Sequence, residues 1–165
     1  MAVASALSLL KLLPFAVLFA APALAHDYSV GNLTLTHPWA RGTPPAPPVA
    51  AGYVTIVNRG GEPDRLLSIT SPAAESIEVH ESTTVDGIAR MQRIDDLVVA
   101  AGQTLALKPG GLHLMILKPS KQLRQGEKFA GTFTFEKAGA IDVEFAVQGI
   151  GETPPLHLEH GDSKQ

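Results

Sequence analysis

Two methionines and two histidines have the residue types and the spacing of a soft-metal site. Beyond Met1, the only methionines in the 165-residue chain are Met91 and Met115. His80 precedes the first of them in the chain, and His113 lies two residues before the second. Methionine ordinarily fills gaps in a hydrophobic core. The pattern of the surrounding strands indicates whether each methionine lies in the core or on the opposite face, where it could bind a metal ion.

The dipeptide Asp86-Gly87 predicts a β-hairpin with a two-residue turn. In that register His80 faces Arg93 and Ser82 faces Met91 across the two strands. Directly paired residues share a face of the sheet, and alternate residues return to it. These four side chains are therefore expected on one face. The opposite face, expected to be the core, carries Ile77, Val79 and Ile94.

A second predicted strand, Leu112–Leu117, repeats this pattern. Its apolar residues Leu112, Leu114 and Ile116 alternate with His113 and Met115. Two strands thus each present a His–Met pair away from the apolar face. The alternative is two unrelated surface pairs or two core methionines.

Thioether sulfur is a soft, neutral donor that favours copper(I), and imidazole also suits copper. Zinc and iron sites would recruit thiolate or carboxylate instead. The chain has no cysteine, which excludes a thiol nucleophile, an iron–sulfur cluster and a blue-copper site. We predict a copper(I) site made by His80, Met91, His113 and Met115. Its four neutral ligands suit moderate binding and hand-over of the ion.

Short β-type runs separated by Gly, Pro and Asp-Gly signals predict an all-β domain. About nine strands at this spacing favour a two-sheet Greek-key sandwich. The expected strands are Asn32–Thr36, Gly52–Asn58, Arg65–Thr70, Ser76–Thr83, Ile88–Ile94, Gln103–Leu107, Leu112–Leu117, Lys128–Phe135 and Ile141–Gln148.

The N-terminal segment 1–25 has the pattern of a secretory signal peptide. One basic residue is followed by a short apolar run and by Ala23-Leu24-Ala25, a small-x-small cleavage signal. We expect a mature chain from about His26, one domain over 26–150 and a flexible tail over 151–165. The formal net charge of −3 does not indicate the basic surface that binds nucleic acid or anionic lipid.

The spacing His80-x10-Met91-x21-His113-x-Met115 resembles the copper-binding signature of the PCuAC family of periplasmic copper chaperones. The match extends over the mature chain to about Ile150. It includes the segments His37-Pro38-Trp39-Ala40-Arg41, Ala50-Ala51-Gly52-Tyr53, Pro63-Asp64-Arg65-Leu66 and Lys108-Pro109-Gly110-Gly111-Leu112.

The resemblance implies a cupredoxin-like Greek-key β-sandwich or barrel that binds copper(I) through those four side chains. It also implies a periplasmic chaperone, not an enzyme. The implied acceptors are the copper A centre of cytochrome c oxidase subunit II and Sco-type proteins. We expect a monomer that does not span a membrane after cleavage. Many members have a second Met two residues after the first His, where this chain has Ser82.

Two other functions stay open at this stage. The terminal histidines His26, His157 and His160 could make a second, weaker copper(II) site, as in a storage or resistance protein. A copper oxidase or a thiol reductase is the other alternative. The lack of cysteine and the presence of four protein ligands argue against such an enzyme.

Overall fold

The computed structural model describes residues 27–152, and these form eleven β-strands and no helix. The strands are β1 (Asp27–Val30), β2 (Leu33–Arg41), β3 (Val49–Asn58), β4 (Asp64–Thr70), β5 (Ala74–Val85), β6 (Ile88–Arg93), β7 (Leu97–Val99), β8 (Thr104–Leu107), β9 (Leu112–Pro119), β10 (Lys128–Phe135) and β11 (Gly139–Gln148). The all-β prediction is confirmed. The estimate of about nine strands was low, because β1 and β7 are too short to show a pattern.

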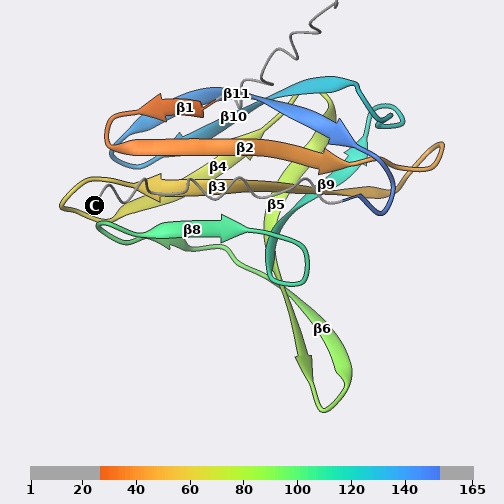
Figure 1. Cartoon of the computed structure of the whole chain (residues 1–165), viewed down its shortest axis with the longest axis horizontal. Coiled ribbons are helices and arrows are strands. Elements are labelled where there is room, and N and C mark those ends of the chain that lie inside the picture. The colour runs from red at the N-terminus through yellow and green to blue at the C-terminus, as the bar shows by residue number, and fades with distance from the viewer. Residues whose placement is uncertain (1–26, 153–165) are drawn as a thin grey trace, which may run out of the picture.

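Seven of the strands close on themselves into a barrel (Figure 1). Hydrogen-bonded neighbours run in the order β2-β11-β10-β4-β5-β9-β3, and β3 pairs again with β2. Closure removes the exposed edges that an open sheet would present. The weakest seam lies between β4 and β5, which share the single pair Ile69↔Ile77. Strands β1, β6, β7 and β8 attach outside this ring.

The barrel is filled by the alternate, inward-facing residues of its strands. Phe133, Phe135 and Phe145 are fully buried and are joined by aliphatic side chains from β2, β3 and β9. The predicted core residues Ile77 and Val79 are buried among them. No helix in the stretch from residue 27 to residue 152 has the length and apolar character needed to cross a membrane.

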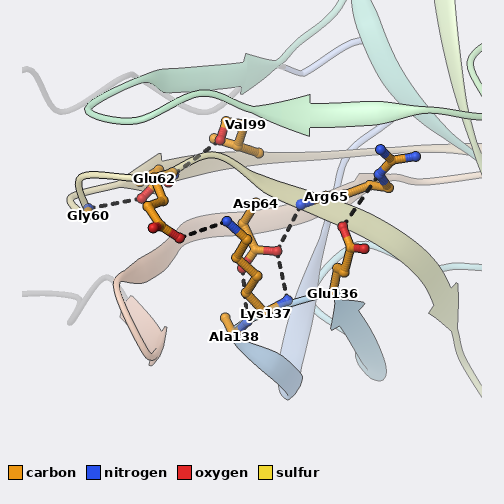
Figure 2. Close-up of polar contacts among 9 residues, drawn as sticks. Gly60, Glu62, Asp64, Arg65, Val99, Glu136, Lys137 and Ala138 are labelled. Carbon is orange, nitrogen blue, oxygen red and sulfur yellow. Dashed lines mark hydrogen bonds and ion pairs between the residues drawn. The ribbon is translucent and has the colours of Figure 1, made fainter.

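Hydrogen bonds at the start of β4 tie two distant parts of the chain together (Figure 2). Asp64 is buried and accepts backbone hydrogen bonds from Arg65 (2.8 Å), Lys137 (2.9 Å) and Ala138 (2.9 Å). Burial alone would raise the pKa of Asp64, but these donors outweigh it and lower the pKa. The network fastens the β10–β11 turn to the point where β4 begins.

The β5–β6 hairpin projects out of the barrel (Figure 1). All six residues of β6 are exposed, and β6 pairs with β5 alone among the described strands. The N-terminal part of β5, residues 74–81, pairs with β9 in the barrel, whereas residues 80–85 pair with β6. One strand therefore carries residues both into the core and onto the projecting arm. This hairpin bears two of the four predicted metal ligands.

Candidate metal centre

The structure confirms the predicted register of the β5–β6 hairpin. His80 pairs with Arg93 and Ser82 pairs with Met91. The turn residues Asp86 and Gly87 both have positive φ, 52° and 76°, as a type I′ turn requires. Local turn chemistry therefore sets which residues of this hairpin face each other.

Strand β9 lies along the other side of β5 and joins the two His–Met pairs. His80 is paired directly with His113, and Glu78 is paired directly with Met115. Residues that are directly paired, or two apart on one strand, share a face. All four predicted ligands therefore lie on one continuous face of β6, β5 and β9. The two imidazole centroids are 6.2 Å apart.

The burial of the four side chains differs from the expected surface site. Met91 is 55% exposed, whereas Met115 and His80 are half-buried and His113 is only 5% exposed. Alternation did place His113 opposite the apolar residues of β9. Its burial has another origin, because β3 and the loop before β9 stand beside it and form a pocket. The site is thus partly sunk into the protein.

This pocket has a volume of about 320 Å³. Met91, His113 and Met115 all line it, together with Ser82; His80 stands beside the pocket and is not in its lining. The remaining walls come from β2, β3 and the loop before β9, through Arg41, Val49, Ala50, Ala51, Tyr53, Pro109 and Gly110. A soft ion placed here would meet two thioethers and an imidazole at an opening to solvent.

Hydrogen bonds fix which nitrogen of each imidazole is free. His113 Nδ1 lies 2.9 Å from the Gly111 carbonyl oxygen. A carbonyl oxygen only accepts, so Nδ1–H donates and the neutral ring keeps its lone pair on Nε2. His80 Nε2 lies 2.9 Å from Glu78 Oε2, so by the same argument its lone pair is on Nδ1. That atom is buried and has no hydrogen-bond partner among residues 27–152.

Glu78 has a role that the sequence analysis missed. It lies two residues before His80 on β5 and therefore on the same face of the sheet. In the structure its other oxygen, Oε1, accepts from Arg93 Nη1 at 2.6 Å, and Arg93 Nε donates to Asp95 Oδ1 at 2.6 Å. A carboxylate that holds the far side of a histidine ring is the usual second partner of a metal-binding imidazole.

Arg41 and two aromatic residues from the predicted motif lie on the same face. Tyr53 is two residues after Ala51, which pairs with Met115. Trp39 pairs with Tyr53 and their ring centroids are 4.3 Å apart. Both aromatics are buried, and Tyr53 also lines the pocket.

The donor set suits a soft ion better than a hard one. Among residues 27–152, no group of three or more His, Cys, Asp or Glu side chains is placed to hold a metal ion. The further soft donors on this face are the thioethers of Met91 and Met115, beside the two imidazoles. His37 is exposed at a bulge in β2, with φ of 51°, well outside the pocket lining. His26, His157 and His160 lie outside the described residues.

The sequence profile of the LpqE-like family, described as "Putative lipoprotein LpqE-like", matches residues 33–147. That stretch covers the barrel and all four predicted ligands. The chain belongs to the LpqE-like (PCuAC) family.

Solved structures with the same fold support this membership. The copper-bound PCuAC domain from PmoF2 is 29% identical, with a TM-score of 0.65, over 75% of this chain and 98% of that one. The apo PmoF2 PCuAC domain gives a TM-score of 0.69 at 28% identity, over 79% of this chain and all of that one. The solution structure of CuI-DR1885 from Deinococcus radiodurans gives 0.57 at 26% identity, over 78% and 83%. The PCuAC-family barrel is therefore cupredoxin-like.

Curated relatives of this PCuAC-family protein carry no assigned activity in their names. "Putative lipoprotein Lxx21020" of Leifsonia xyli subsp. xyli is 31% identical over 101 residues. "Uncharacterized protein RP573" of Rickettsia prowazekii is 29% identical over 88 residues. The aligned part spans 61% of the first relative and 49% of the second.

Proposed function

We propose that this protein binds one copper(I) ion through His80, Met91, His113 and Met115 and passes it to acceptor proteins. The observation that carries the proposal is the common face of β6, β5 and β9, which brings both His–Met pairs together. Names of similar structures point the same way, since one is a copper-bound PCuAC domain and another a CuI-bound protein.

The free lone pairs support this ligand set. Nδ1 of His80 is buried without a partner in the stretch 27–152, and a buried acceptor left unpaired is costly unless something else binds it. The bond that His113 Nδ1 makes to Gly111 leaves the lone pair of its neutral ring on Nε2. Copper(I) accepts both imidazole nitrogen and thioether sulfur. The ion would thus satisfy the buried Nδ1 of His80 and bind the lone pair of His113.

The uneven burial of the ligands supports a carrier and not an enzyme. His113 is buried and fixed, whereas Met91 is exposed on the projecting hairpin. An acceptor could displace the exposed thioether first while the buried imidazole still holds the ion. Copper(I) is then the cargo, and no bond of a substrate has to be broken.

The cellular setting is proposed from the sequence. Segment 1–25 would direct export, the domain over 26–150 would act in the periplasm, and segment 151–165 would be a tail. The proposed acceptors are the copper A centre of cytochrome c oxidase subunit II and Sco-type proteins. The protein would act as a monomer, and His26, His157 and His160 would supply at most a weaker copper(II) site.

An anaerobic copper(I) titration against a chromophoric chelator tests the proposal. The expected result is one tightly bound ion per chain, lost in the double variant Met91→Ala, Met115→Ala. His37→Asn is the matched control, since it removes an exposed imidazole outside the pocket and keeps a residue that tolerates positive φ. A folded wild-type protein that takes up no copper(I) would refute the proposal.

A further inference from the structure

Arg41 places a positive charge beside the candidate metal centre, and the proposed copper ligands do not account for it. It ends β2 and lines the same pocket as Met91, His113 and Met115. Its Nε atom is buried and has no hydrogen-bond partner in the described part of the chain. Within residues 27–152, no carboxylate forms an ion pair with it.

The arginine that shares the face of the ligands, Arg93, is neutralised. Arg93 is held by Glu78 at 2.6 Å and by Asp95 at 2.6 Å. Glu78 is in turn bound to His80. Among residues 27–152, the pocket wall formed by Arg41 therefore keeps an uncompensated positive charge, whereas the charge of Arg93 on the ligand face is paired.

The field of Arg41 reaches the pocket lining. Burial raises the pKa of Tyr53, and the guanidinium of Arg41 partly offsets that rise. Tyr53 lines the pocket along with His113 and Met115. A cation placed among these residues would feel the same charge, in a medium that screens it less than water does.

We propose that Arg41 is a charge filter that makes this pocket selective for monovalent over divalent metal ions. The inference rests on the proposed function and adds a residue that sets its specificity. All four proposed ligands are neutral, so nothing in the ligand set offsets the charge of a bound ion. Coulomb repulsion is proportional to the charge of the ion. Arg41 therefore penalises a divalent ion twice as much as a monovalent one.

This proportionality gives a quantitative test. Replacing Arg41 by Gln should raise copper(I) affinity by roughly tenfold and copper(II) or zinc affinity by roughly a hundredfold. Silver(I), a soft ion of the same charge as copper(I), should follow copper(I). On a logarithmic scale the divalent change is twice the monovalent change. Arg41→Lys keeps the charge and should retain the wild-type selectivity.

The matched control is Arg90→Gln. Arg90 is exposed on β6 next to Met91, but it pairs with Thr83 and faces away from the ligand face. This variant also loses one positive charge but keeps Arg41 in the pocket. The ratio of monovalent to divalent affinity should therefore stay the same. Thermal unfolding of each variant verifies that the barrel is intact.

A second variant tests the inference if Arg41→Gln fails to fold. In Arg41→Leu the side chain is neutral and apolar, so the divalent change in affinity should again be twice the monovalent change on a logarithmic scale. Equal changes for both charge classes, in either variant, would overturn the charge filter and leave the carrier proposal standing. A folded wild-type protein that binds neither copper(I) nor silver(I) would instead overturn the carrier proposal.

Discussion

His80 and His113 lie directly opposite each other on β5 and β9, with ring centroids 6.2 Å apart. Each ring is held from a different side, His80 by the carboxylate of Glu78 and His113 by the carbonyl of Gly111. Backbone pairing thus sets the separation of the imidazoles, and two hydrogen bonds set their orientation. Binding an ion here would require little further ordering of these rings.

Glu78→Gln should weaken copper(I) binding by about 10- to 100-fold, the usual effect of losing the partner behind a metal-binding histidine. The amide no longer offers a charged acceptor to His80 Nε2–H, so the free lone pair on Nδ1 is less firmly fixed. Chelator competition measures the loss. Glu81→Gln is the matched control, because Glu81 is on the same strand but faces the other way. Equal affinities in the two variants would show that Glu78 does not position His80.

Met91→Ala should lower copper(I) affinity by roughly tenfold or more while changing the free energy of unfolding by no more than about 0.5 kcal/mol. The side chain is 55% exposed, so little packing is lost. Ile88→Ala serves for comparison, since Ile88 is 60% exposed on the same strand and lies off the ligand face. A drop of several degrees in Tm for Met91→Ala would indicate a packing role instead.

Gly87→Ala should destabilise the hairpin by about 1 kcal/mol, because φ of 76° suits glycine and strains alanine. No atom lies within 4 Å of the added Cβ, so the cost is conformational and not steric. Native-state hydrogen exchange should show faster exchange in β6 and unchanged protection in β10 and β11. Gly61→Ala, also in open space but without positive φ, should leave β6 as in the wild type.

Asp64→Asn should cost about 2–3 kcal/mol of stability at neutral pH, because three backbone N–H groups lose a charged acceptor. The folded-state pKa of Asp64 lies below its ordinary value of about 3.9. Its contribution is therefore present above about pH 4 and is lost as the pH falls through the folded pKa. Urea unfolding at pH 7 and pH 3 should show the two proteins converging in acid. A constant difference would contradict the assignment.

The sequence predicted local features of this fold well. Asp86-Gly87 determined the hairpin register, since turn chemistry acts over a few residues. Alternation placed Leu114 and Ile116 in the core and put His113 and Met115 on the other face. The short strands β1 and β7 were missed, because three or four residues give no period to recognise.

Long-range pairing could not be predicted from these patterns. The local sequence of β5 and of β9 does not indicate that His80 pairs with His113, because that pairing depends on closure of the barrel. The same limit explains the burial of His113 and the approach of Arg41, which comes from β2. Strand pattern alone identified the ligand candidates, whereas the pocket around them follows from tertiary packing.

A copper(I) X-ray absorption spectrum of the protein loaded with one equivalent of copper identifies the ligand atoms of the bound ion. We expect mixed ligation, with nitrogen from His80 and His113 and sulfur from Met91 and Met115. The sulfur contribution should vanish in the double variant Met91→Ala, Met115→Ala. A spectrum with nitrogen or oxygen ligands alone, unchanged in that variant, would contradict the His–Met site.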